Sequence, residues 1–266
     1  MALKTRRPTG RSPWPFLLIA GGEKCGKSYA CAEFSASPLT GRTLWIEVGE
    51  SSADQYGALP GADYEIVDHD GTFPSILQAA IDATSEPATG RPNAIIVDSA
   101  TNLWDLLCDE QQAVAARRGK TSPTMDQWNT AKRQWRQFVD VLRRHAGPVI
   151  VTARFEQVTV VDGGRPTGEK QWKIRAEKNL PFDVDGIVEI PHPRQYYLSG
   201  MRSLHLQVPP GEHMLLDVNF TIDGLLRQLD VDGTDRAYTP AREDPDRFTT
   251  GDMGRLDALL RQEGDQ

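Results

Sequence analysis

The sequence predicts an α/β fold, in which a mostly parallel central β-sheet has helices on both faces and is followed by a β-rich C-terminal extension. Short apolar runs of strand length recur along the chain, for example at residues 16–20, 94–97 and 148–153. Segments whose apolar residues have helical spacing separate these runs. Strands buried on both faces are apolar throughout, and helices usually connect parallel strands, so this alternation favours a doubly covered sheet.

The first apolar run leads into Gly21-Gly-Glu-Lys-Cys-Gly-Lys-Ser28 and then into a helical pattern from Tyr29. A G-x-x-x-x-G-K-S motif between a strand and a helix is typical of a phosphate-binding loop. Its glycines allow a turn that points backbone N–H groups at phosphate, Lys27 supplies a cation, and the Ser28 hydroxyl is a ligand for Mg²⁺. The residues expected to bind the nucleotide are Gly21, Gly22, Glu23, Lys24, Cys25, Gly26, Lys27, Ser28 and Tyr29.

The second expected strand, residues 43–48, is predicted to lie beside the first, and its end carries Glu47 and Glu50. A carboxylate near the terminal phosphate of a nucleotide orients or deprotonates the attacking water. We favour Glu50, because it lies past the strand end, where nucleotides sit on such sheets. The alternative is that both carboxylates are ordinary charges at the end of a strand.

The run at residues 94–97 ends in Asp98 and Ser99. An apolar strand that ends in a carboxylate, downstream of a phosphate-binding loop, supplies the second half of a metal–phosphate site. We therefore expect Ser28 and Asp98 to hold Mg²⁺. Ser99 lies either near the terminal phosphate or at the cap of the following helix.

Two longer helices are expected at residues 102–117 and 126–145, and Gly147-Pro148 ends the second. The next apolar strand, residues 148–153, carries Thr152 near its end and is followed by Arg154. At this position Arg154 is expected either to contact phosphate or to pair with a carboxylate.

After Arg154 the alternation of apolar strands and helical patterns ends. Residues 157–161 and 171–175 flank a Gly- and Pro-containing stretch and predict a hairpin. Lys173 and Arg175 fall on one face of its second strand. Alternation alone is compatible with solvated charges of an edge strand. The expected organisation is a basic arm at 1–13, a core at 14–190, a β-rich extension at 191–229 and an acidic, Pro-containing tail with a short terminal helix at 230–266.

Composition narrows the functional class. The net charge of −7 gives no global basic field, so any contact with nucleic acid must come from local patches. Cys25, Cys31 and Cys108 have no metal-binding spacing and suit a reducing cytosol. No apolar run approaches the length of a membrane span, which leads us to expect a cytoplasmic protein without a membrane partner.

Taken together, these motifs resemble the compact RecA-core P-loop ATPases encoded by tailed phages of actinobacteria. Such proteins are usually labelled AAA-family ATPases or RecA-like, single-strand-annealing-type recombination proteins. The resemblance covers roughly residues 14–190. Besides the phosphate-binding loop, the matching stretches are Trp45-Ile-Glu-Val-Gly-Glu50, Val97-Asp-Ser99, Leu103-Trp-Asp-Leu-Leu107, Asn129-Thr-Ala-Lys132, Val151-Thr-Ala-Arg154 and Lys178-Asn-Leu-Pro-Phe182.

The resemblance implies hydrolysis of ATP with Mg²⁺ by a homo-oligomer, ring or filament, with ATP at the subunit interfaces. It implies single-stranded DNA as a partner, a single-strand-binding or other recombination protein as a further one, and the host cytoplasm as the location. Glu50 would position water, and Lys173 and Arg175 would reach the γ-phosphate of the neighbouring subunit. Thr152 and Arg154 stand where this group usually has an amide that senses the γ-phosphate, which is a departure from its pattern.

Two other functions compete with this one. An ATP-dependent switch or assembly protein would act on a protein partner without DNA, and the negative charge with the acidic tail favours it mildly. A small-molecule kinase would also need the phosphate-binding loop, but the sequence contains no recognisable Arg-rich lid.

Overall fold

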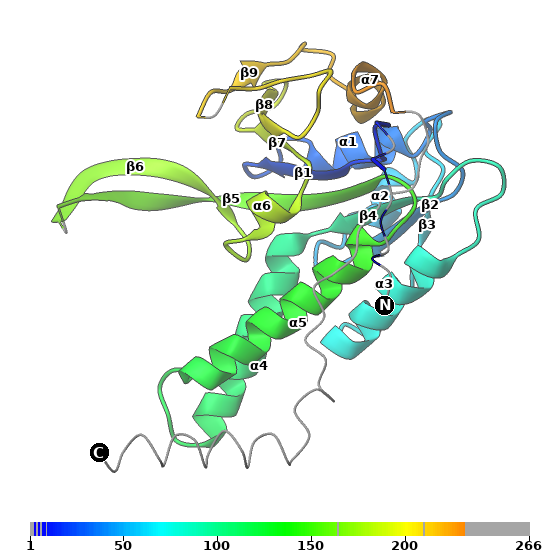
Figure 1. Cartoon of the computed structure of the whole chain (residues 1–266). Coiled ribbons are helices and arrows are strands. Elements are labelled where there is room, and N and C mark those ends of the chain that lie inside the picture. Colours follow the sequence, from blue (N-terminus) through cyan, green and yellow to red (C-terminus); the bar gives the residue numbers. More distant parts are fainter. Residues whose placement is uncertain are drawn as a thin grey trace.

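The structure, a computed structural model, describes residues 3, 5, 7, 8, 10–163, 165–209 and 211–231 (Figure 1). Most strands are parallel members of a single sheet. The strands are β1 (Phe16–Gly21), β2 (Thr43–Glu47), β3 (Glu65–Ile66), β4 (Ala94–Asp98), β5 (Val149–Asp162), β6 (Arg165–Arg175), β7 (Gly186–Ile190), β8 (Tyr197–Met201) and β9 (Met214–Leu215).

The order of the strands in the sheet is β3-β2-β4-β5-β1-β7-β8-β9, with β6 paired to β5. The pairs from β3 to β7 are parallel, and β6, β8 and β9 pair antiparallel. This confirms the predicted fold class. The expectation that the second strand lies beside the first is wrong, because β4 and β5 separate β2 from β1. Helical crossovers allow strands that follow one another in sequence to lie apart in the sheet.

Helices cover both faces of the sheet, as predicted. In β1, Phe16, Leu18 and Ala20 pack with α3, α4 and α5, whereas Leu17 and Ile19 pack with α1 and α7. This alternation places one hydrophobic core on each side of the strand. The helices are α1 (Lys27–Phe34), α2 (Ala53–Tyr56), α3 (Phe73–Ser85), α4 (Ala100–Arg117), α5 (Met125–Arg143), α6 (Leu180–Asp183) and α7 (Ile222–Gln228).

The strand β5 has two roles. Its first half pairs with β1 and β4 in the core, and from Arg154 onward it pairs with β6 in a hairpin that projects from the body of the protein (Figure 1). The predicted hairpin is therefore confirmed, and it begins where the core sheet ends. Arg154 stands at the junction between the two halves.

Residues 191–229 continue the same sheet with β8 and β9 and then form α7. Not all of this segment is strand, because Leu204 lies outside the strands and is 89% exposed. The short helix expected near residues 255–262 lies outside the described residues. In the described part of the chain, no helix combines the length and the apolar character that a membrane crossing requires.

Candidate active site

The carboxyl ends of β1, β4 and β5 meet at one edge of the sheet, because these strands are parallel neighbours. A cavity of about 730 Å³ opens there, within the usual size range of ligand sites. It is lined by loop residues 23–28, by Glu50 after β2, and by Asp98 and Arg154. The fold thus brings together residues from Glu23 to Phe155, which lie 132 positions apart in the sequence.

Gly21 and Gly22, at the start of the loop, allow the chain to pack closely against the end of β7. A Cβ on Gly21 would lie 2.7 Å from Cys25 Sγ and still closer to the carbonyl oxygen of Ile190, and Gly22 N–H donates to that oxygen at 3.1 Å. Gly26 differs, because its φ of 103° is a left-handed conformation that favours glycine. Neither Gly21 nor Gly22 lines the cavity.

Tyr29, the last residue of the expected nucleotide-binding set, lies on α1 outside the lining of the cavity. It is 45% exposed, and its ring packs edge to face on the ring of Tyr56, with 6.4 Å between the centroids. Tyr56 lines the cavity, so Tyr29 borders the site through another side chain.

The ammonium group of Lys27 hydrogen-bonds within its own loop. Nζ donates to the carbonyl oxygens of Gly22 at 2.8 Å and Gly21 at 3.4 Å, and lies 3.9 Å from Cys25 Sγ. Burial raises the pKa of the Cys25 thiol, although the nearby Lys27 charge opposes the shift. The loop therefore presents a cation beside a neutral thiol.

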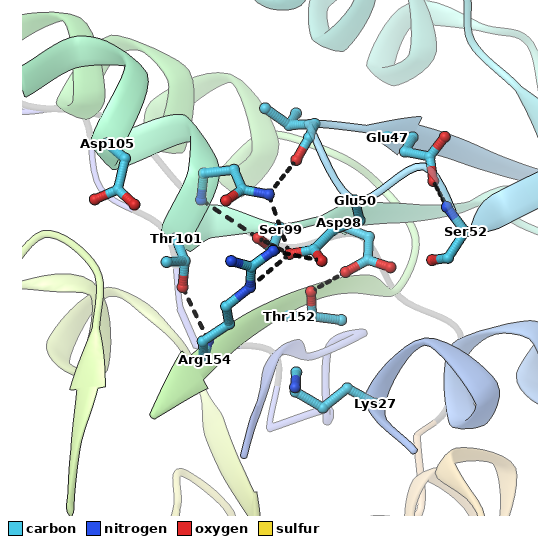
Figure 2. Close-up of polar contacts among 12 residues, drawn as sticks. Lys27, Glu47, Glu50, Ser52, Asp98, Ser99, Thr101, Asp105, Thr152 and Arg154 are labelled. Carbon is cyan, nitrogen blue, oxygen red and sulfur yellow. Dashed lines mark hydrogen bonds and ion pairs between the residues drawn. The ribbon is translucent and has the colours of Figure 1, made fainter. Parts of the chain in front are cut away.

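Asp98 is 1% exposed at the end of β4. Its Oδ1 accepts a hydrogen bond from the Thr152 hydroxyl, while Oδ2 is buried and has no hydrogen-bond partner of normal geometry among the described residues (Figure 2). Burial raises the pKa of Asp98, and the nearby hydroxyls of Ser28 and Thr152 oppose that rise. A hydroxyl and an unpaired carboxylate oxygen beside a phosphate-binding loop fit Mg²⁺, which prefers oxygen ligands and retains bonds to water and phosphate.

Glu50 and Arg154 both line the cavity and contact each other directly (Figure 2). Arg154 Nη2 donates to Oε2 at 2.7 Å and Nε donates to Oε1 at 3.1 Å. The Ser99 hydroxyl at 2.6 Å and Asn102 Nδ2 at 3.1 Å also donate to Oε1. Burial raises the pKa of Glu50, but the bonds from Arg154 and Ser99 outweigh it, and the pKa is lowered.

Glu47, the other carboxylate at the end of the second strand, does not line the cavity. Its Oε1 accepts from the backbone N–H groups of Ser52 at 2.5 Å and Ala53 at 2.8 Å, at the start of α2. Glu47 thus fixes the loop that carries Glu50.

Ser99 has the cap role that the sequence left open, because its hydroxyl accepts from Asn102 N–H at 3.3 Å at the start of α4. The same hydroxyl donates to Glu50, so the cap is also part of the site.

Lys173 and Arg175 stand on β6, outside the lining of the cavity. Arg175 forms an ion pair with Asp105 at 2.8 Å. Lys173 has no ion-pair or hydrogen-bond partner within the part of the chain that the structure describes, and it lines a separate cavity of about 350 Å³ with Phe155 and Trp172. The structure therefore brings Lys27, Ser28, Glu50, Asp98 and Arg154 together and leaves the two β6 cations apart.

Sequence reasoning did not identify two polar residues in the first turn of α4. Asn102 Nδ2 donates to Val48 O at 2.9 Å as well as to Glu50. The Thr101 hydroxyl accepts from Arg154 N–H at 2.9 Å and donates to Arg175 O at 2.6 Å. The sequence feature that indicates them is their position three and four residues after Asp98, where a helix begins beside the site.

The match to a protein-family model agrees with the motifs. The family model for an AAA domain, AAA_24, matches residues 15–207. A comparison with curated protein sequences finds no match. Among solved structures, the crystal structure of the RadB recombinase is similar with 14% identity and a TM-score of 0.46, over 78% of this chain and 89% of that chain. The family match spans most of the sequence and includes both the phosphate-binding loop and Asp98, and the chain therefore belongs to the AAA_24 family of AAA domains.

Proposed function

We propose that this protein is a Mg²⁺-dependent ATPase of the RecA-like type that acts on single-stranded DNA in phage recombination or single-strand annealing. The observation that carries the proposal is the single cavity that contains the loop residues Lys27 and Ser28, the buried carboxylate of Asp98, and Glu50. This set provides a cation for phosphate, oxygen ligands for a metal, and a carboxylate for water.

The residues of the chain have separable tasks in this proposal. Lys27, released from the carbonyl oxygen of Gly22, stabilises charge that develops on the transferred phosphoryl group. Ser28 and Asp98 Oδ2 are the groups that would hold Mg²⁺, which when bound neutralises charge on the phosphate oxygens. Glu50 orients the attacking water and accepts its proton.

Self-assembly is the second part of the proposal. Lys173 and Arg175 lie outside the cavity of their own chain, on a hairpin that projects from the body (Figure 1). Lys173 has no partner among the described residues, and Arg175 would exchange its ion pair with Asp105, so that both would reach the nucleotide of a neighbouring copy, as arginine fingers do. We propose that the ATP site is completed by these residues across a subunit interface.

The DNA part of the proposal rests on the resemblance to phage recombination proteins, since the net charge of −7 supplies no general attraction. The test is ATP hydrolysis with and without single-stranded DNA, over a series of salt concentrations. We expect stimulation that falls as salt rises, because phosphate contacts release counterions. Hydrolysis that DNA leaves unchanged at low salt would contradict the DNA role.

A nucleotide-dependent switch acting on a protein partner is the second candidate, and one observation favours it. The Glu50 carboxylate accepts bonds from Ser99, Asn102 and Arg154, which lower its pKa and weaken it as a base. ATP binding without measurable turnover, with or without DNA, would favour this candidate over the ATPase.

A further inference from the structure

The two carboxylate oxygens of Glu50 are held in different ways. Oε1 accepts from three side chains: Ser99, Asn102 and the Nε of Arg154. Oε2 accepts only from Arg154, through Nη2 at 2.7 Å, among the interactions of the described residues. Removal of the Arg154 guanidinium would therefore free Oε2, while Oε1 would stay bound to Ser99 and Asn102.

The present arrangement opposes proton acceptance by Glu50. Oε1 already accepts three hydrogen bonds, more than its two lone pairs, and the charged Arg154 Nη2 shares Oε2, the oxygen with a lone-pair site to spare. A bidentate guanidinium also stabilises the ionised form and so weakens the carboxylate as a base. Glu50 is thus placed at the cavity but is restrained.

Arg154 has both the exposure and the chemistry to exchange this partner for another. Its side chain is 44% exposed and lines the same cavity as Lys27. A guanidinium binds phosphate with the same fork geometry that it uses for a carboxylate. Its backbone N–H stays bonded to the Thr101 hydroxyl, so only the side chain needs to move.

The position of Arg154 favours the terminal phosphate. The residue ends the core half of β5, between the phosphate-loop strand β1 and the Asp98 strand β4. Lys27 covers the β- and γ-phosphates in loops of this type, and Arg154 and Glu50 line the part of the cavity contributed by the neighbouring strands. A nucleoside diphosphate lacks the group that would reach this part.

We propose that Arg154 is a phosphate-responsive restraint on Glu50. Without a nucleoside triphosphate it holds Oε2; the terminal phosphate draws it away, and Ser99 and Asn102 keep the carboxylate in place through Oε1. This inference rests on the proposed nucleotide site and concerns its regulation. It makes Ser99 and Asn102 positioning residues, and it couples the freeing of Glu50 to the presence of the triphosphate.

The first test compares the affinities of a non-hydrolysable ATP analogue and of ADP, both with Mg²⁺, by calorimetry on the full chain. In Arg154→Ala we expect the affinity for the analogue to fall about tenfold, because charge-assisted bonds to the terminal phosphate are lost. The affinity for ADP should change by less than about twofold. Arg42→Ala is the matched control, because Arg42 forms a similar bidentate pair with Glu65, at 2.7 and 2.7 Å, outside the cavity.

The second test is structural and does not depend on any variant. Crystal structures with the analogue and with ADP should show Arg154 away from Oε2 in the first and on Oε2 in the second, with Oε1 bound to Ser99 and Asn102 in both. A triphosphate complex in which Arg154 keeps both bonds to Glu50, or an equal loss of both affinities in Arg154→Ala, would overturn the restraint. Failure of the wild-type chain to bind either nucleotide would overturn the proposed function as well.

Discussion

Thr152 on β5 donates a hydrogen bond to Oδ1 of Asp98 on the neighbouring strand β4, whereas Oδ2 has no hydrogen-bond partner among the residues that the structure describes (Figure 2). The pair orients a buried group from one side, as the outer partners of metal ligands do. Thr152 stands where the resemblance implied a phosphate sensor, and its hydroxyl points instead to the expected metal ligand.

Thr152→Val keeps the shape of the side chain and removes the donor. We expect the Mg²⁺ concentration needed for half-maximal ATP binding to rise about tenfold, because the ligand loses its orienting partner. The free energy of unfolding should fall by about 1–3 kcal/mol, because a buried acceptor is left unpaired. Thr159→Val, at an exposed position of the same strand, is the control for a general effect on β5. An unchanged Mg²⁺ requirement in Thr152→Val would contradict the role of Asp98 as a ligand.

Asp98→Asn should separate function from stability. Because burial raises the pKa of Asp98, the folded chain binds this proton more tightly than the unfolded chain. The protonated group therefore contributes stability that is complete below the usual pKa of 3.8 and is lost as pH rises through the raised value. Without Mg²⁺ at neutral pH, the Asn variant should be more stable to urea than the wild type, and the difference should shrink at lower pH. A variant less stable than the wild type at neutral pH would contradict the conclusion that burial disfavours the ionised form of Asp98.

Mixing two inactive variants tests whether Lys173 acts across a subunit interface. Lys27→Ala and Lys173→Ala should each lack ATP turnover, yet Lys173→Ala should still bind ATP. If one subunit supplies Lys27 and its neighbour supplies Lys173, an equal mixture should leave about a quarter of the sites intact. Turnover in the mixture should recover to about that share. No recovery in mixtures shown to co-assemble would contradict action of Lys173 across the interface.

Gly21→Ala tests the packing of the loop against the end of β7. The added methyl group would meet Cys25 Sγ at 2.7 Å and the Ile190 carbonyl oxygen even closer, so we expect a loss of about 1–3 kcal/mol in stability. Gly200→Ala, on β8, is the matched control, since a Cβ there would have no neighbour within 4 Å. Equal effects of the two substitutions on urea unfolding would contradict a specific clash at Gly21.

Local sequence patterns predicted individual strands and the hairpin, because these depend mainly on residues close together in the chain. Uniformly apolar runs gave β1, β4 and the first half of β5, and the Gly- and Pro-containing stretch gave the hairpin. The order of the strands was not predictable in the same way. Two strands separate β2 from β1, and local patterns do not reveal this order because it depends on how the crossover helices pack on the sheet.

The individual site residues were easier to identify than their partners. Lys27, Ser28 and Asp98 belong to short motifs, whereas the bond between Arg154 and Glu50 joins residues 104 positions apart. The contacts of Asn102 and Thr101 in the site were not predicted. A polar side chain in the first turn of a helix is common, and its partner depends on tertiary packing.

The most direct test of the central claim is ATP hydrolysis with Mg²⁺ by the wild-type chain and by Lys27→Ala at equal concentrations. We expect the wild type to hydrolyse ATP and the variant to lose about 100-fold or more of that rate, because charge on the transferred phosphate loses its stabilising cation. Normal turnover by a folded Lys27→Ala variant would contradict the assignment of this cavity as the ATP site.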